Sequence, residues 1–132
     1  MEKPIAVKDI MAIDVITFTP KQNVFEVIEL LLNSRKSGGS VLNEDGKIVG
    51  FISEKDCLKT TVHSSYYDGM GALVGDLMSK NVDTLDANES IHSAAQKFLD
   101  CHYRRFPVVK DGMLVGHLSR KDILQAVQSI PH

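Results

Sequence analysis

The chain is 132 residues long, with 43% hydrophobic and 24% charged residues, which suits one modest core or two small half-cores packed together. Its formal net charge is −2, and both signs are interspersed along the chain, so no long-range field attracts a polyanion. Length therefore excludes a second large domain within this chain, and charge argues against nucleic acid as a partner.

The cysteine content and the apolar stretches favour a reduced, cytoplasmic setting. Cys57 and Cys101 form no Cys-x-x-Cys pair and have no histidine at zinc-ligand spacing, so we expect neither a disulfide framework nor a metal site. The first residues lack the basic flank and apolar run of a secretion signal. The most apolar stretch, 24–32, is short and contains Glu26 and Glu29, so we expect no membrane contact.

The second half of the chain repeats the first. Identical residues recur at one constant offset, and after a one-residue shortening just before Gly112 they recur at the next smaller offset. We therefore divide the chain into repeat 1 (1–62), a polar linker (63–71) and repeat 2 (72–132). The matched pairs are Val7/Val74, Asp9/Asp76, Met11/Met78, Val15/Val82, Thr17/Thr84, Leu32/Leu99 and Val41/Val108, then Gly46/Gly112, Val49/Val115, Gly50/Gly116, Ser53/Ser119, Lys55/Lys121, Asp56/Asp122 and Leu58/Leu124.

Each half opens with a short helical turn that carries Asp-(Ile/Leu)-Met, followed by a small β-branched strand expected over 15–18 and 82–85. A helix is expected next over 24–32 and 91–99, because apolar residues recur there at i, i+3, i+4, i+7 and i+8. The natural N-caps of these helices are Asn23 and Ser90.

A β-hairpin and a last helix complete each half. The hairpins are expected over 40–52 and 106–118, with turns at Glu44-Asp45-Gly46 and Asp111-Gly112. An amphipathic helix then opens at the serine that ends each hairpin. The order strand, helix, strand, strand, helix predicts an α/β (α+β) fold. Since one half is too small to bury its own apolar faces, the halves must pack on each other.

The most informative motif closes each hairpin, as Gly50-Phe51-Ile52-Ser53-Glu54-Lys55-Asp56 and Gly116-His117-Leu118-Ser119-Arg120-Lys121-Asp122. A strand ends there and a helix begins, so unpaired backbone N–H groups are available to an anion. The glycine leaves room for a ligand, the serine can bond a phosphate oxygen, and the aspartate can accept hydrogen bonds from a ribose diol. The same Ser-x-x-Asp is also a helix-capping pair, and the sequence leaves both interpretations open.

The pattern Gly-h-x-(Ser/Thr)-x-x-Asp, closing two repeats that each begin with Asp-(Ile/Leu)-Met, resembles the tandem pair of cystathionine-β-synthase-type (CBS) domains called a Bateman module. The resemblance spans nearly the whole chain. It implies two CBS repeats packed sheet to sheet about a pseudo-two-fold axis, with two clefts that bind AMP, ADP, ATP or S-adenosylmethionine as regulatory ligands. It also implies that Asp56 and Asp122 hold ribose hydroxyls, that Ser53 and Ser119 contact phosphate, and that Thr17 and Thr84 line the pocket.

The two repeats differ where the ligand would bind. Repeat 2 has Phe106-Pro107-Val108, as is common in the family, whereas repeat 1 has Gly39-Ser40-Val41 and loses an apolar wall. Repeat 1 also places Glu54 close to the expected phosphate, so we expect the second site to be the better nucleotide site. The predicted ligand-binding residues are Thr17, Gly50, Ser53, Asp56, Thr84, Arg104, Arg105, Phe106, Pro107, Gly116, His117, Ser119, Arg120 and Asp122.

Several of these residues have plainer interpretations. Arg104 and Arg105 are equally well explained as solvated surface charges, and a histidine on a strand, such as His117, is typically packed or exposed to solvent. The leading hypothesis is a non-catalytic regulatory module that senses an adenosyl ligand and signals to a separate effector protein, with no required cofactor. The family's habit further predicts a homodimer.

Two other functions compete with this hypothesis. One is a structural or dimerisation module with vestigial ligand sites that acts through protein–protein interaction. The other is a small nucleotide hydrolase, which would need clustered acids, whereas each motif offers one clear aspartate and no serine nucleophile with a histidine base is legible. We therefore expect no catalytic residue and no metal site.

Overall fold

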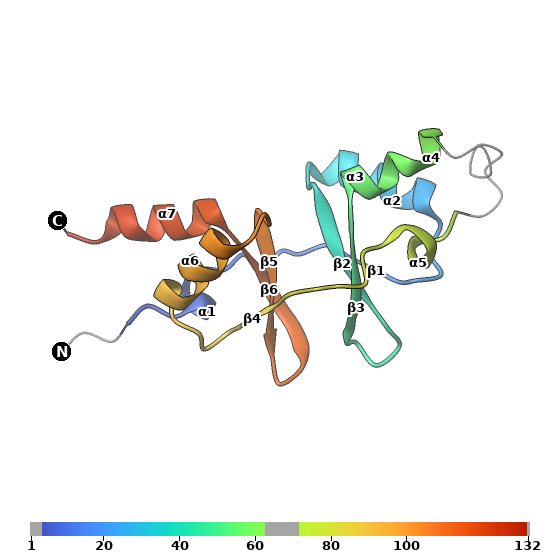
Figure 1. The fold of residues 1–132 in the computed structure, drawn as a ribbon. Coiled ribbons are helices and arrows are strands. Elements are labelled where there is room, and N and C mark those ends of the chain that lie inside the picture. The colour runs from blue at the N-terminus through green and yellow to red at the C-terminus, as the bar shows by residue number, and fades with distance from the viewer. Residues whose placement is uncertain (1–3, 63–71, 132) are drawn as a thin grey trace. The chain divides into compact units, whose positions relative to one another are not determined.

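The computed structural model describes residues 4–62 and 72–131. The chain forms two compact units, which we name after the motif aspartate that each contains: the Asp56 unit, Ile16–Val82, and the Asp122 unit, Met1–Val15 with Asp83–His132. Each unit is built on its own three-stranded sheet (Figure 1). In each unit a strand, a helix, two strands and a helix follow one another in the expected order, so the mixed α/β fold class is confirmed.

The sheet of the Asp56 unit has the strand order β1-β2-β3, with β1 parallel to β2 and β2 antiparallel to β3. Its core is formed by apolar residues of the sheet and of the helices packed on one face, among them Phe18, Val27, Val41 and Ile52. The elements of this unit are β1 (Thr17–Phe18), α2 (Val24–Ser34), β2 (Gly38–Leu42), β3 (Ile48–Ser53), α3 (Glu54–Cys57), α4 (Lys59–Val62) and α5 (Val74–Leu77).

The sheet of the Asp122 unit repeats this pattern with the order β4-β5-β6. Its core includes Leu85, Phe98, Val108 and Leu118. The elements are α1 (Val7–Ile10), β4 (Leu85–Asp86), α6 (Ile91–Asp100), β5 (Arg105–Lys110), β6 (Met113–Ser119) and α7 (Arg120–Ser129). Within residues 4–62 and 72–131, every helix is too short or too polar to cross a bilayer.

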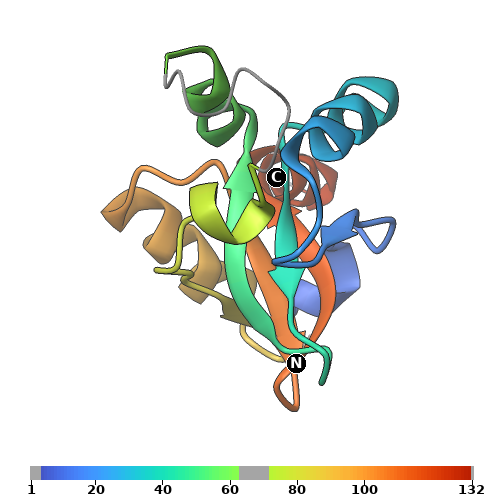
Figure 2. The ribbon, with the colours of Figure 1, turned by 90° about the vertical axis from the view of Figure 1, so that its right-hand side faces the viewer.

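Each unit contains the Asp-h-Met segment of the other sequence repeat. α5, from repeat 2, packs Val74 and Leu77 into the core of the Asp56 unit and lies beside β3 in both views (Figures 1 and 2). α1, from repeat 1, places Val7 in the core of the Asp122 unit. The boundaries of the compact units therefore differ from the sequence repeats 1–62 and 72–132, which remain a division of the sequence.

Local signals in the sequence are confirmed. Asn23 Oδ1 accepts from the Phe25 amide at 2.8 Å, and Ser90 Oγ accepts from the Ser93 amide at 3.1 Å, so both predicted N-caps form. The predicted turns also form, because Gly46 and Gly112 both have φ 80° and Asp111 has φ 53°. The second turn thus has two consecutive residues with positive φ, as a two-residue type I′ hairpin requires.

The apolar stripe of α2 and α6 is narrower than the periodicity predicts. Leu32 and Leu99 match the template, yet they are 69% and 80% exposed. The i+8 position of a helix lies about 80° around the axis from position i, at the edge of the buried stripe. The predicted last helix of repeat 1 is also interrupted, because a turn at Leu58 separates α3 from α4, whereas α7 is continuous.

Candidate functional site

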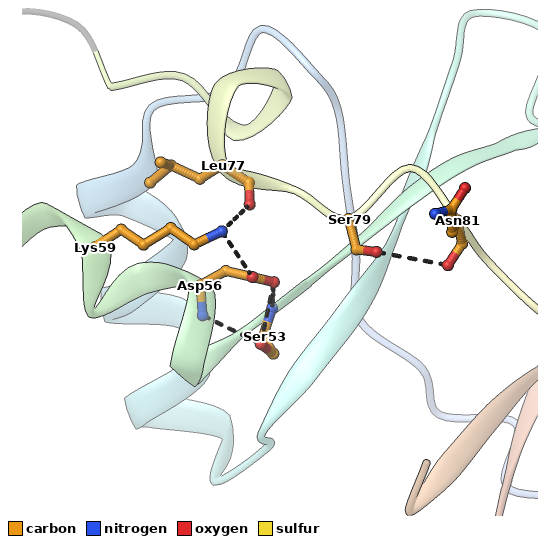
Figure 3. Close-up of polar contacts among 6 residues, drawn as sticks. All are labelled: Ser53, Asp56, Lys59, Leu77, Ser79 and Asn81. Carbon is orange, nitrogen blue, oxygen red and sulfur yellow. Dashed lines mark hydrogen bonds and ion pairs between the residues drawn. The ribbon is translucent and has the colours of Figure 1, made fainter. Parts of the chain in front are cut away.

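The Ser-x-x-Asp motif of the Asp56 unit forms a capping box at the start of α3 (Figure 3). The Ser53 amide donates to Asp56 Oδ2 at 2.9 Å, and the Asp56 amide donates to Ser53 Oγ at 3.2 Å. The Ser53 hydroxyl also donates to Asp56 Oδ2 at 3.1 Å. All three bonds leave Oδ1 of Asp56 outside the cap.

The Asp122 unit has the same capping box at the start of α7. The Ser119 amide donates to Asp122 Oδ2 at 2.9 Å, and the Asp122 amide donates to Ser119 Oγ at 3.2 Å. The capping interpretation of the motif is therefore confirmed in both units. The capping interpretation does not exclude a ligand, because the cap uses only one oxygen of each carboxylate and a carboxylate can accept about four hydrogen bonds.

A lysine that the sequence analysis missed binds the remaining oxygen in one unit only. Lys59 Nζ lies 3.3 Å from Asp56 Oδ1 and donates to the Leu77 carbonyl at 3.3 Å, so it joins the start of α4 to the end of α5 (Figure 3). The side chains of Lys59 and Asp56 are 47% and 17% exposed. The i, i+3 spacing of an aspartate and a lysine was the available signal.

Beside the motif glycines Gly50 and Gly116, the space that a side chain would fill is occupied by the protein itself, and their predicted role in ligand binding stays a prediction. A Cβ on Gly50 would lie 2.5 Å from Met78 Sδ and 2.9 Å from the Ser79 carbonyl oxygen. A Cβ on Gly116 would lie 2.7 Å from Met11 Sδ and 2.6 Å from the Ala12 carbonyl oxygen. The space beside each glycine is filled by the Asp-h-Met segment of its own unit.

Strand alternation divides the candidate residues of the Asp56 unit between two faces of the sheet. Thr17 pairs with Ser40, and Ser40 pairs with Phe51, so these residues share the face that carries Ser53. Gly50 lies on the opposite face, with the core. A Cβ on Gly38, on the Ser53 face, would lie 2.7 Å from Phe51 Cε1, so the phenyl ring covers Gly38 and supplies apolar surface there.

The Asp122 unit is divided in the same way. Pro107 pairs with His117 and Arg105 pairs with Ser119, so all four residues share one face. Phe106 lies on the core face, where its ring centroid is 4.7 Å from that of Phe98.

Phe106 therefore packs in the core and Pro107 is the apolar residue on the face of Ser119, while the predicted ligand contact of Phe106 stays a prediction. Thr84 directly precedes β4. His117 is buried, and its backbone pairs with Ala12, which favours the packed interpretation of this histidine.

The backbones of three arginines, Arg104, Arg105 and Arg120, lie close to the start of α7. The Arg120 amide donates to the Arg104 carbonyl at 3.3 Å, and Arg120 Nη2 donates to the Tyr103 carbonyl at 3.1 Å. Among the residues that the structure describes, Arg104, Arg105 and Arg120 form no ion pair with a carboxylate. At the corresponding start of α3, the first residue is Glu54, so the two motifs carry opposite charge at this position.

The described residues contain no cluster of metal ligands, and the thiol of Cys57 is not activated. In the ranges 4–62 and 72–131, no three His, Cys, Asp or Glu side chains come together to bind an ion. Burial, with smaller effects from Asp56 and Glu54, raises the pKa of Cys57 from 9.0 to about 11. This thiol is therefore protonated and poorly nucleophilic near neutral pH.

Comparison with known proteins identifies the family. The CBS domain model matches residues 7–63 and 74–129. CBSX1, a chloroplastic CBS domain-containing protein of Arabidopsis thaliana, is 32% identical over 84% of this chain, which spans 58% of its length. The uncharacterized protein MJ1426 of Methanocaldococcus jannaschii is 28% identical over 92% of this chain, which spans 90% of its length.

Solved structures agree in fold. The structure of CBSX2 from Arabidopsis thaliana in complex with AMP is 28% identical, with a TM-score of 0.81, and the match covers 93% of this chain and 96% of that one. A second is the CBS domain pair of protein MJ0100 in complex with 5′-methylthioadenosine and S-adenosyl-L-methionine. It is 25% identical, with a TM-score of 0.78, over 93% of this chain and 99% of that one.

Proposed function

This chain belongs to the CBS domain family and carries two copies of the domain, and on that premise we propose that it is a non-catalytic regulatory module that binds an adenine nucleotide or another adenosyl ligand. The observation that carries the proposal is the likeness, over 93% of the chain, to a CBS-pair structure in complex with AMP. The complex of the MJ0100 pair with two adenosyl compounds supports the same ligand class.

The Asp122 unit supplies groups of the right chemistry for such a ligand. Asp122 Oδ1 lies outside the capping box and makes no other hydrogen bond within the described part of the chain, so it can accept from a ribose hydroxyl. Ser119 and the arginines Arg104, Arg105 and Arg120 offer donors to phosphate oxygens. Pro107 lies on the same face of the sheet as Ser119 but is itself buried.

A thermal-shift panel with AMP, ADP, ATP, S-adenosylmethionine and NAD tests the proposal. A ligand that binds only the folded state at about 100 times its Kd adds about 2.7 kcal/mol to the free energy of unfolding and raises Tm. We expect a rise with at least one adenosyl compound, and a smaller rise in Asp122→Ala. If none of the five compounds raises Tm, the module does not sense this ligand class.

A specific observation also favours self-association, so we propose that the chain forms a homodimer. Leucines at matched repeat positions are exposed in both halves: Leu58 and Leu124 are 63% and 66% exposed, and Leu32 and Leu99 are exposed as well. Large apolar side chains that are exposed next to one another are typical of an interface. Light scattering should show a dimer for the wild type. Of two double variants, Leu58→Lys with Leu124→Lys and Leu32→Lys with Leu99→Lys, at least one should be a monomer. A wild-type monomer at working concentration contradicts this proposal.

A further inference from the structure

We propose that Lys59 occupies the ribose-accepting oxygen of Asp56 and thereby makes the Asp56 unit the weaker of two adenosyl sites. The inference rests on the proposed function, because it concerns how the same two motifs share a ligand. It assigns a role to a residue that lies outside the Ser-x-x-Asp motif.

The two carboxylate oxygens of each motif aspartate have different partners. In both units Oδ2 of the motif aspartate accepts the backbone amide of the capping serine at 2.9 Å. Oδ2 is therefore committed to the start of the helix. The oxygen left for a ribose diol is Oδ1, in Asp56 as in Asp122.

In the Asp56 unit a lysine lies at that oxygen. In the Asp56 unit, Lys59 Nζ is 3.3 Å from Asp56 Oδ1, and the Leu77 carbonyl, also at 3.3 Å, holds the ammonium on its other side. Two acceptors on separate helices keep the lysine beside the carboxylate (Figure 3). A ribose hydroxyl approaching Oδ1 has to displace or share this donor.

The Asp122 unit has no lysine at the corresponding position. Counted from the motif aspartate, the residue that corresponds to Lys59 is Gln125, in α7, which carries no charge. α1 contacts α7 in the Asp122 unit, and its residue Ile10 corresponds in the repeat to Leu77. A lysine at position 125 would lie three residues after Asp122 on a helix that contacts α1, but the chain has glutamine there.

The size of the effect follows from the exposure of the pair. Lys59 is about half exposed, so its attraction to Asp56 is that of a surface pair, and its loss changes affinity by about two- to fivefold. Lysine can act in the opposite sense if it donates to a ligand phosphate, in which case its removal weakens binding. The direction of the change therefore decides between the two roles.

The test uses AMP as probe and isothermal titration of the full chain, in a background where Asp122→Ala disables the other site. Adding Lys59→Gln should tighten the remaining site about two- to fivefold. Lys55→Gln removes the same charge from an exposed lysine of α3 that forms no ion pair within the described residues, so it should leave affinity unchanged. Melting curves for each variant establish that it is folded.

The reciprocal variant keeps the test independent of that background. Gln125→Lys, in a chain with Asp56→Ala, should weaken AMP binding at the Asp122 unit by a similar factor. If the lysine and glutamine exchanges leave affinity unchanged, or if Lys59→Gln weakens it, the role of Lys59 is refuted while the proposed function stands. If AMP binds neither the wild type nor any variant, this inference fails, and the proposed function stands only if another compound of the thermal-shift panel binds.

Discussion

Replacing Gly116 by alanine tests whether the motif glycine serves packing or ligand binding. The added methyl group would lie 2.6 Å from the Ala12 carbonyl oxygen and 2.7 Å from Met11 Sδ. The methionine can move aside, but the carbonyl belongs to a backbone bridge in which Ala12 and His117 exchange two hydrogen bonds of 2.9 Å. Overpacking of this kind typically costs about 1–3 kcal/mol, and we expect the upper half of that range because backbone has to shift.

The assay is urea unfolding of Gly116→Ala and of its repeat counterpart Gly50→Ala, with Gly75→Ala as the control. At Gly75 the nearest atom to an added methyl is the Pro20 carbonyl oxygen at 3.2 Å, so a small change is expected there. A Gly116→Ala protein within about 0.5 kcal/mol of wild type that has lost AMP binding would refute the packing argument and support the idea that the glycine leaves room for a ligand.

Three further outcomes are expected. Arg35 ends α2 with φ 58° and ψ 33°, so Arg35→Gly should raise the free energy of unfolding by about 1 kcal/mol in a urea titration; a decrease would mean that its side chain outweighs the strain. Ser90→Ala removes the N-cap of α6 and should lower the free energy of unfolding by about 1 kcal/mol in the same urea titration. No change would show that water replaces the cap. Because the pKa of Cys57 rises from 9.0 in the unfolded chain to about 11 in the folded one, the unfolded state loses its proton first. Stability should therefore fall between pH 9 and 11, at up to about 1.4 kcal/mol per pH unit, and Cys57→Ala should flatten this slope in melts across that range.

The elements of the fold were predictable because their signals are local. The caps Asn23 and Ser90 and the turns at Gly46 and Gly112 each depend on residues within a few positions, and all form as expected. Alternation along β5 also contained the signal that places Phe106 with the core, since its neighbours Arg105 and Pro107 lie on the other face.

The role of the motif glycines was not predictable, because it depends on a contact distant in sequence. Met78 lies against Gly50, and Met11 lies against Gly116, only because the Asp-h-Met segment of one repeat packs in the unit built on the other. The motif glycine, serine and aspartate are identical in the two repeats, so the repeated pattern suggested one shared role for all three. In fact the glycine faces the core, and the serine and aspartate cap a helix on the other side.

Duplication explains why the two units share a cap and differ around it. Because the cap stabilises the start of the helix, repeat 2 has the same pair, as Ser119 and Asp122, that repeat 1 has as Ser53 and Asp56, whether or not a ligand binds. Differences in ligand affinity must then come from residues that the cap does not constrain. In the Asp56 unit the Phe51 ring lies over Gly38, where the Asp122 unit has His117 and Arg105.

A side chain at position 38 would collide with that ring and with the Ile52 carbonyl oxygen, which is 2.8 Å from an added Cβ. The glycine and the phenylalanine are therefore coupled, and an arginine corresponding to Arg105 cannot be introduced at position 38 while Phe51 remains. Together with Glu54 and Lys59, this pair leaves the Asp56 motif with apolar surface and a carboxylate already paired, whereas the three arginines near the Asp122 motif form no ion pair among the described residues. The same capped aspartate is thus set in two environments of different charge.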